Sequence, residues 1–298
     1  MTGRLDEAGF GRLLADMRPR LHRYCARMVG SAFDGEDVVQ EALTKAAEAF
    51  PAAGPIERPE SWLFRIAHNS AQDALRRRKR QRAVRSEIEP VDVADSHAAA
   101  DARVAATASL AAFMRLPSTP RACVVLTDVL GYSTEETVAI LGVSLAAAKA
   151  ALRRGRQRLQ TLAATPEDDA APLSASERDR LRDYADRFNA RDFDALRDLL
   201  AEDVQLDMPN RRRLGGRSEV SRYFTHYDEI ADWRLSPGLA DRRPALLVSD
   251  PADVDATVRY VVLLEWTDGR IASIRDYRFA AYVMEGIALR RAFLPGDR

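Results

Sequence analysis

The sequence has no run of about twenty apolar residues, the length that a helix needs to cross a bilayer, so we expect no membrane span. Its first residues form no apolar signal core, and we therefore expect a cytoplasmic protein. Cysteine is scarce, because Cys25 and Cys123 are the only two and they lie far apart in the sequence. This scarcity argues against a disulfide framework and favours two buried, reduced thiols.

Histidine is also scarce, and neither positive nor negative residues are in excess. The four histidines have no metal-ligand spacing, so we expect no structural metal and no cofactor. The chain carries 45 basic and 45 acidic residues, and this balance gives it no global attraction to a polyanion. Local patches decide instead, because arginine dominates residues 65–85 and 153–158.

Positive charge is most crowded at residues 76–80, which have the sequence Arg-Arg-Arg-Lys-Arg. The run closes a helix-like stretch that starts at Trp62. Phosphates attract such charge, and aromatic or amide side chains can bind unstacked bases, so the pattern favours a nucleic acid as partner. The alternative is a solvated charged run at the edge of a domain.

The helix-like stretch has two faces. One face could hold a nucleic-acid strand with splayed bases, and it carries residues in steps of three and four, namely Trp62, Ile66, Asn69, Asp73, Arg76 and Arg80. The core-facing stripe carries Leu63, Ala67, Ser70 and Ala74. Asn69 is the better candidate for a base contact, because an amide is both donor and acceptor. Core packing explains Trp62 better than base stacking does.

The 298 residues are enough for two or three domains. Composition and periodicity divide them into a helical region (1–85), a linker (86–108), a second helical region (109–163), a second linker (164–176) and an α+β domain (177–298). In the last region, helices at 177–189 and 193–200 precede strands at 204–208, 245–248, 256–266 and 271–278. The expected fold class is therefore multidomain, with all-α domains followed by an α+β domain that has a curved antiparallel sheet.

A helix is predicted over residues 36–50, with Asp34 as its cap. Its apolar face carries Val39, Leu43, Ala46 and Phe50. The opposite face is polar and carries Asp37, Gln40, Glu41, Thr44 and Glu48. A loop follows, and Pro59 lies in the first turn of the next helix.

A helix-turn-helix is predicted over residues 133–162. Ser133 and Glu136 form a capping box for a short helix that ends at Leu141, Gly142 makes the turn, and Ser144 caps the second helix. The apolar stripe of the second helix contains Leu145, Ala148, Leu152, Gly155, Leu159 and Leu162. Basic and polar residues lie away from this stripe, namely Lys149, Arg153, Arg154, Gln157 and Arg158, and they can meet phosphates. The alternative is a helical hairpin with a basic solvent face.

The sequence contains two sets of motifs, one in each helical region. The first contains Asp37-Val38-Val39-Gln40-Glu41-Ala42 and, further on, Ser61-Trp62-Leu63-Phe64-Arg65-Ile66-Ala67-His68-Asn69 with the arginine run; it resembles sigma domain 2. The second contains Gly131-Tyr132-Ser133-Thr134-Glu135-Glu136 and Arg153-Arg154-Gly155-Arg156, and it resembles sigma domain 4. Residues 8–163 therefore resemble an extracytoplasmic-function (ECF) sigma factor of bacterial RNA polymerase.

The resemblance implies binding partners for each region. It implies that core RNA polymerase is bound at its clamp helices and flap, with clamp contacts at Asp37, Gln40, Glu41 and Leu43. It implies that the −10 promoter element is opened and bound by Arg65, His68, Asn69, Asp73, Arg76 and Arg77. It implies that the −35 element is bound by Ser144, Lys149, Arg153, Arg154 and Arg156.

The chain continues for about 120 residues after the helix-turn-helix. Residues 184–204, Gly216-Arg217 and Asp268-Gly269-Arg270-Ile271 are similar to a SnoaL-like, ketosteroid-isomerase-like cone fold. That fold implies a pocket for a small-molecule ligand and, in its enzymes, a buried general base, for which Asp207, His226 and Asp276 are candidates. Tyr223, Trp233 and Trp266 are the candidate walls. We favour the alternative that Asp207 and Asp276 are strand-end carboxylates paired with Arg217 or Arg275, without catalysis.

The sequence therefore predicts a promoter-specificity subunit that is not an enzyme, with a carboxyl-terminal domain that regulates it. Two other functions stay open. One is a cone-fold isomerase or hydrolase fused to a DNA-binding helical region. The other is a helix-turn-helix regulator that acts independently of polymerase.

Overall fold

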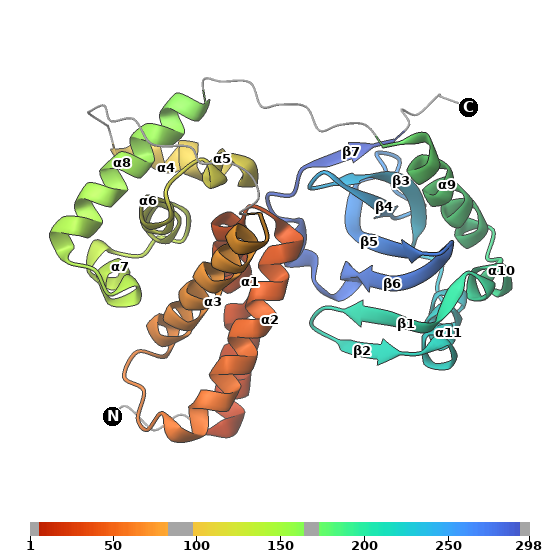
Figure 1. Cartoon of the computed structure of the whole chain (residues 1–298), viewed down its shortest axis with the longest axis horizontal. Coiled ribbons are helices and arrows are strands. Elements are labelled where there is room, and N and C mark those ends of the chain that lie inside the picture. The colour runs from red at the N-terminus through yellow and green to blue at the C-terminus, as the bar shows by residue number, and fades with distance from the viewer. Residues whose placement is uncertain (1–5, 83–97, 164–172, 293–298) are drawn as a thin grey trace. The chain divides into compact units, whose positions relative to one another are not determined.

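The computed structural model describes residues 6–82, 98–163 and 173–292 (Figure 1). They divide into two compact units, with the boundary between Glu167 and Asp168. The amino-terminal unit is helical, and the carboxyl-terminal unit combines helices with one sheet. The predicted fold class, all-α domains followed by an α+β domain, is confirmed.

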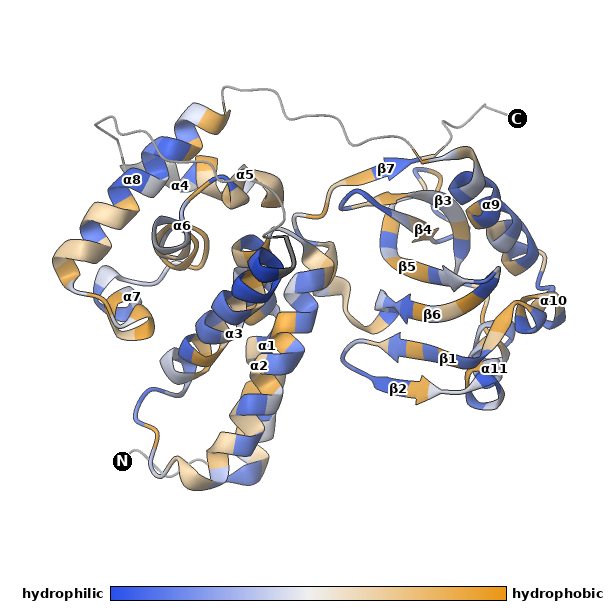
Figure 2. Ribbon diagram, viewed as in Figure 1, coloured by the Kyte–Doolittle hydropathy of each residue, from blue (hydrophilic) through white to orange (hydrophobic). Residues whose placement is uncertain are grey.

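The first helical module of the amino-terminal unit consists of α1 (Glu7–Val29), α2 (Ala32–Ala49), the 3₁₀ turn η1 (Phe50–Ala52) and α3 (Pro59–Arg82). Figure 2 shows hydrophobic and hydrophilic residues alternating along α2, as the predicted apolar and polar faces require. The predicted cap of this helix is wrong: the Ser31 hydroxyl accepts the Asp34 N–H at 3.3 Å, so Ser31 is the cap and Asp34 lies in the first turn. Pro59 begins α3, as predicted.

The second helical module consists of α4 (Ala98–Thr107), α5 (Leu110–Met114), α6 (Ser118–Val124), the π-helical turn η2 (Val125–Val129), α7 (Thr134–Leu141) and α8 (Leu145–Ala163). The predicted helix-turn-helix is confirmed. Both hydrogen bonds of the Ser133–Glu136 capping box are present, and Gly142 makes the turn with a φ of 69°. The Ser144 hydroxyl accepts the Ala147 N–H at 3.2 Å and so caps α8.

The apolar stripe of α8 packs on the second module. Five of its six predicted members are buried, namely Ala148, Leu152, Gly155, Leu159 and Leu162. Leu145 is 42% exposed, so its prediction as a core residue is wrong, and the packed stripe begins one turn later. A Cβ atom on Gly155 would lie 2.5 Å from Val124 Cγ2 and 2.9 Å from the Pro120 carbonyl oxygen. Only glycine therefore lets α8 cross α6 this closely.

The predicted linker 86–108 is partly structured. Residues 98–107 form α4, which packs against η2 and α8 and buries Ala105 completely. The rest of this linker, residues 86–97, lies outside the described residues, and so do residues 164–172 of the second predicted linker.

Within its described residues, 173–292, the carboxyl-terminal unit has three helices, α9 (Ala175–Asn189), α10 (Phe193–Asp198) and α11 (Arg217–Asp228), and two 3₁₀ turns, η3 (Tyr277–Phe279) and η4 (Ala281–Met284). Its strands are β1 (Leu200–Met208), β2 (Arg212–Gly215), β3 (Arg234–Ala240), β4 (Arg243–Ser249), β5 (Val258–Thr267), β6 (Arg270–Asp276) and β7 (Leu289–Arg291). They form one sheet in the order β2-β1-β6-β5-β4-β3-β7.

The sheet is antiparallel except between β1 and β6, which pair in parallel. The prediction missed β2, β3 and β7. Strand β3 contains Pro237 and Gly238, two residues that argue against a strand when only the sequence is known. Gly238 is needed there, because a Cβ atom would lie 2.6 Å from the Arg290 carbonyl oxygen of β7.

The two cysteine thiols are buried and unlinked, and burial raises the pKa of Cys123 to about 11. Within the part of the chain that the structure describes, no helix has both the length and the apolar character needed to cross a membrane. The same residues include no cluster of three or more side chains that could hold a metal ion.

Candidate functional site

The polar face of α2 carries the residues predicted to contact polymerase. Asp37 is exposed, and Gln40 and Glu41 are half-buried. Leu43 is only 9% exposed and belongs to the core, so it offers little surface to a partner. Three of the four predicted residues therefore reach the surface of α2.

Glu41 lies in a small charge cluster between α2 and α3. Its carboxylate accepts hydrogen bonds from Lys45 and from Arg77, both at 2.7 Å. Partial burial alone raises the pKa of Glu41, but the two hydrogen bonds outweigh it and the pKa is lowered. The predicted polymerase contact Glu41 and the predicted DNA contact Arg77 therefore hold each other in place.

The residues predicted to bind the −10 element lie along α3. Asn69 and Arg76 are exposed, and Arg76 pairs with Asp73 at 3.1 Å. His68 is half-buried, and its Nδ1 atom lies 2.6 Å from the Tyr24 hydroxyl. Burial lowers the pKa of His68, which keeps the ring uncharged at neutral pH. Asn69 is thus an exposed amide on the surface of α3.

Two aromatic and basic residues of α3 are engaged elsewhere. Trp62 is partly buried against the core, where its ring centroid lies 6.2 Å from that of Phe10, as core packing predicts. Arg65 has an exposed side chain that donates a hydrogen bond to the Ala139 carbonyl oxygen in α7. This contact joins the two helical modules.

The second helix of the helix-turn-helix has a basic outer face. Lys149, Arg153 and Arg154 are exposed on α8, away from its buried stripe. Arg156 differs, because it donates two hydrogen bonds to the Asp128 carboxylate, at 2.9 and 2.6 Å. Asp128 is 2% exposed, so this ion pair fastens α8 to η2. Arg156 therefore has a structural role in the described state.

The three candidate bases of the carboxyl-terminal unit do not converge on one place. Asp207 is opposite Arg275 in the β1–β6 register, and its carboxylate lies 3.8 Å from Arg275 and 3.2 Å from Arg213. Asp276 is the next residue along β6, and side chains alternate between the faces of a strand, so Asp276 points to the opposite face. His226 is exposed on α11. The predicted pairing of Asp207 with Arg275 is present.

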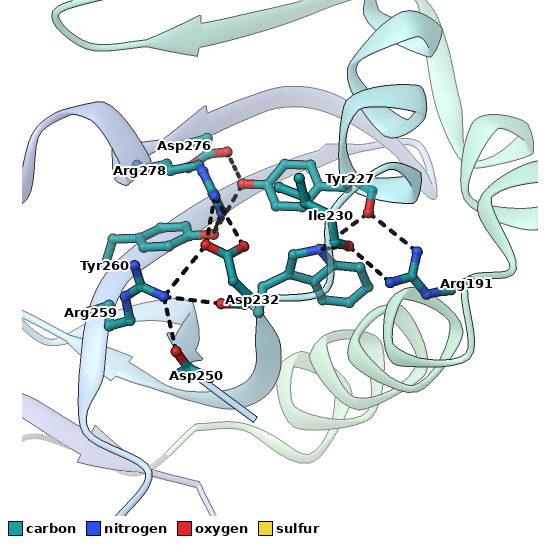
Figure 3. A network of polar contacts seen from close by, with 10 residues as sticks. Arg191, Tyr227, Ile230, Asp232, Asp250, Arg259, Tyr260, Asp276 and Arg278 are labelled. Atoms are coloured by element: carbon teal, nitrogen blue, oxygen red, sulfur yellow. Dashed lines mark hydrogen bonds and ion pairs between the residues drawn. The ribbon is translucent and has the colours of Figure 1, made fainter. Parts of the chain in front are cut away.

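Asp276 is the centre of a buried polar network (Figure 3). Its carboxylate accepts hydrogen bonds from the hydroxyls of Tyr223, at 2.9 Å, and Tyr227, at 2.5 Å. It also accepts the backbone N–H of Arg278 at 2.8 Å. The Tyr227 hydroxyl lies 3.2 Å from that of Tyr260, which accepts from the Arg278 guanidinium at 2.9 Å. The network thus joins α11 to β5 and β6.

Burial sets the protonation of this network. Burial raises the pKa of Asp276, although the two tyrosine hydroxyls and the Arg278 N–H act in the other direction. Burial also raises the pKa of Tyr260 to about 12. Arg278 extends the network to Asp232, whose two carboxylate oxygens both lie 3.0 Å from the guanidinium.

The sequence predicts only part of this network. Asp276 and Tyr223 were predicted as candidate site residues, whereas Tyr227, Tyr260 and Arg278 were not. Tyr223 and Tyr227 are four residues apart, a spacing that places both on one face of a helix and could have predicted a paired role. The contacts of Tyr260 and Arg278 depend on how β5 pairs with β6. The sequence alone does not determine the register of that pairing.

Three family models match the chain. Sigma-70 region 2 matches residues 13–81, Sigma-70 region 4 matches residues 109–159, and the SnoaL-like domain matches residues 181–274. The first two matches cover the two helical modules, and the third covers the carboxyl-terminal unit from α9 to β6.

Several curated proteins are similar to the chain. The ECF RNA polymerase sigma factor SigG of Mycobacterium tuberculosis is 32% identical over 218 residues, which are 64% of this chain and 59% of SigG. The ECF RNA polymerase sigma factor SigM of the same species is 33% identical over 158 residues, which are 53% of this chain and 78% of SigM. Among solved structures, the Mycobacterium tuberculosis ECF sigma factor SigJ is 20% identical, with a TM-score of 0.36, over 91% of this chain and 98% of SigJ.

Asp276 has a structural role that substitution can measure. Replacing it by alanine leaves two buried tyrosine hydroxyls and one backbone N–H without their acceptor, so we expect the carboxyl-terminal unit to lose about 3 kcal/mol in its free energy of unfolding. Asp207→Ala removes ion pairs that are partly exposed and should cost less than ~1 kcal/mol. Urea titration followed by circular dichroism measures both.

The pH dependence of the free energy of unfolding tests the raised pKa of Asp276. The raised pKa means that folded Asp276 holds a proton that the unfolded chain releases above its ordinary pKa of 3.8. The stability that Asp276 contributes is therefore largest below that pH and falls as the pH rises through the raised value. The cost of Asp276→Ala should be greater at acidic than at neutral pH, and an equal cost at both would contradict a raised pKa.

Proposed function

Because the chain belongs to the ECF RNA polymerase sigma factors, we propose that it directs RNA polymerase to specific promoters and starts transcription there. The observation that supports this most directly is the helix-turn-helix whose second helix exposes Lys149, Arg153 and Arg154. A second basic helix, α3, precedes it in the chain with Asn69 and Arg76 exposed. Sigma factors are initiation factors, so Asp207, His226 and Asp276 have no catalytic role in this proposal.

The polymerase contact is proposed at the polar face of α2. Asp37 is exposed there, and Gln40 and Glu41 are partly accessible beside it. The clamp helices of the polymerase are the proposed partner of this face, and the flap is the proposed partner of the second helical module. Glu41 pairs with Lys45 and Arg77 and is half-buried, whereas the Asp37 side chain is exposed on the same face.

The two promoter elements are proposed to bind different helices. On α3, the Asn69 amide can bind a base, while Arg76 contacts phosphate. On α8, Lys149, Arg153 and Arg154 contact the phosphates around the −35 element, and Ser144 orients the start of the helix through its cap. Arg156 supports this surface through its ion pair with Asp128.

Run-off transcription tests the proposal. Purified protein added to core polymerase should produce a defined transcript from a promoter of its own genome. Asp37→Arg reverses the charge of the proposed polymerase contact and should weaken association with core polymerase at least ~10-fold. Asp16→Arg, a matched change at an exposed position on α1, should leave association unchanged. No binding to core polymerase by the parent protein would refute the proposal.

The proposed −35 contact has its own test. Replacing Arg153 and Arg154 together by glutamine should weaken promoter binding and lower the slope of log K against log salt by about 2, because each phosphate contact contributes roughly 0.9. Arg103→Gln with Arg115→Gln removes two exposed arginines from the same module outside α8. Fluorescence anisotropy at several salt concentrations measures both pairs, and an unchanged slope for the first pair would contradict the assignment.

We further propose that the carboxyl-terminal domain regulates this activity by binding a small polar molecule. The supporting observation is Tyr184 on α9, whose buried hydroxyl has no hydrogen-bond partner among the described residues. Burial raises the pKa of Tyr184, and the charge of Asp276 raises it further, so the hydroxyl stays protonated. A buried donor of this kind normally has an acceptor, which a carbonyl or phenolate oxygen of a ligand would supply.

Native mass spectrometry tests for this ligand. Protein purified from its own bacterium should carry a bound small molecule. Tyr184→Phe removes the donor and should lose that added mass, whereas Tyr282→Phe, a tyrosine outside the Asp276 network, should retain it. Retention of the molecule by Tyr184→Phe would contradict the assignment, and so would its absence from the parent protein.

A further inference from the structure

Residues 229–233 join α11 to β3 and form neither helix nor strand, although all five are described. This connecting segment is held by arginine side chains from elsewhere in the carboxyl-terminal unit (Figure 3). Arg191 donates to the Ile230 carbonyl oxygen at 2.9 Å. Arg259 of β5 donates to the Asp232 carbonyl oxygen at 3.1 Å. A segment held by a few side-chain contacts opens locally at a lower cost than a strand inside the sheet.

The Asp232 side chain of the connecting segment pairs with the guanidinium of Arg278. The Nη2 atom of Arg278 lies 3.0 Å from both oxygens of the Asp232 carboxylate, and its Nη1 atom donates to the Tyr260 hydroxyl at 2.9 Å. The guanidinium also lies 5.6 Å from the ring centroids of both Tyr227 and Tyr260. The Arg278 side chain is 18% exposed, whereas that of Asp232 is 42% exposed. The arginine therefore belongs to the buried network, and the carboxylate that pairs with it comes from a segment at the surface.

The next residue, Trp233, places an aromatic ring beside the same network. Its side chain is buried, and its ring centroid lies 4.8 Å from that of Phe188 and 5.8 Å from that of Tyr227. The indole N–H donates to the carbonyl oxygens of Tyr227, at 3.2 Å, and Ile230, at 3.1 Å. Two consecutive residues of the connecting segment thus supply a carboxylate to an arginine and a ring to an aromatic cluster.

These contacts define the kind of molecule that can take the place of the segment. A guanidinium pairs best with a carboxylate or a phosphate, and the single charge of Asp232 matches a carboxylate. The rings of Phe188 and Tyr227 favour another aromatic ring against them. A molecule without a ring would leave a cavity where the indole of Trp233 had packed, which lowers stability. The contacts are therefore matched best by a small aromatic carboxylic acid.

We propose that the carboxyl-terminal domain binds a small aromatic carboxylic acid at Arg278, and that the connecting segment occupies this site in the described state. The carboxylate of the acid replaces that of Asp232, and its ring replaces the indole of Trp233. Binding therefore releases residues 229–233 from their contacts. The segment acts as an internal competitor, so the acid binds only at the cost of displacing it.

The site adjoins the buried Tyr184 hydroxyl, so this inference rests on the proposed function of the carboxyl-terminal domain and names a class of ligand for it. Phe188 follows Tyr184 by four residues on α9, and their ring centroids are 5.8 Å apart. A ring in the place of Trp233 packs against Phe188 and is separated from Tyr184 by that one side chain. Tyr184 can then donate to a second oxygen of the same molecule.

Isothermal titration calorimetry of the full-length protein with indole-3-acetate tests the site, because this acid combines an indole with one carboxylate. Indole-3-acetate should bind, and indole-3-acetamide, which has nearly the same shape without the charge, should bind at least ~10-fold more weakly. Asp232→Asn removes the competing carboxylate and should raise the affinity for indole-3-acetate at least ~10-fold. The matched control Asp228→Asn removes a nearby carboxylate that pairs with Arg191 instead, and it should leave the affinity unchanged.

Hydrogen exchange followed by mass spectrometry detects release of the connecting segment. Indole-3-acetate should increase exchange in peptides that cover residues 229–233, and Asp232→Asn should show part of this increase without any ligand. Arg278→Gln should lose binding of the acid. If circular dichroism shows that Arg278→Gln is unfolded, the gain of affinity in Asp232→Asn decides, because misfolding does not raise affinity.

Three results would overturn the inference. They are the absence of indole-3-acetate binding to both the parent protein and Asp232→Asn, unchanged or lower exchange of residues 229–233 on binding, and binding of inorganic phosphate as tight as that of the acid. The proposed ligand binding at Tyr184 can fail separately. A co-purified molecule that Tyr184→Phe loses, but that excess indole-3-acetate does not displace, would support that proposal and contradict this one. If the parent protein carries no such molecule, calorimetry and hydrogen exchange still decide the inference.

Discussion

Helix ends need partners for their last carbonyl groups, and in the amino-terminal unit arginine side chains supply several of them. Arg78 of α3 donates to the Val29 carbonyl oxygen at 2.9 Å, and Arg121 of α6 donates to Met28 next to it. The end of α1 is thereby fixed from two sides. Arg65 does the same for α7. These charged caps add to the packing that the shared apolar core provides.

The chain has no net charge, yet it carries basic surfaces on α3 and α8. Its arginines have two different roles, which cannot be told apart in the sequence. Arg156 is turned inward toward Asp128, and Arg121 is turned inward toward the Met28 carbonyl oxygen of α1, so both shape the fold. Arg153 and Arg154 are turned outward and leave positive charge at the surface. Only contacts in three dimensions separate the groups, because neighbours along one helix differ in role.

The sequence predicted those features that depend on local chemistry. The capping box at Ser133, the turn at Gly142 and the apolar stripe from Ala148 onward are set by residues within one or two turns of each other, and all are present. The errors concern choices between near neighbours or contacts distant in sequence. Ser31 caps α2 instead of Asp34, because both are good caps and residue preference alone does not choose between them. Strand β3 and the partners of Asp276 depend on sheet register, which local patterns do not determine.

The placement of Arg65 connects fold and function most closely. Its guanidinium donates to the Ala139 carbonyl oxygen in the last turn of α7, a group that has no partner within its own helix. The contact lies one helical turn before Asn69, so the arginine that joins the two modules stands next to the exposed amide of the same helix. Substitution of Arg65 would therefore remove a contact between the modules together with a positive charge of α3, and one variant at this position cannot separate the two effects.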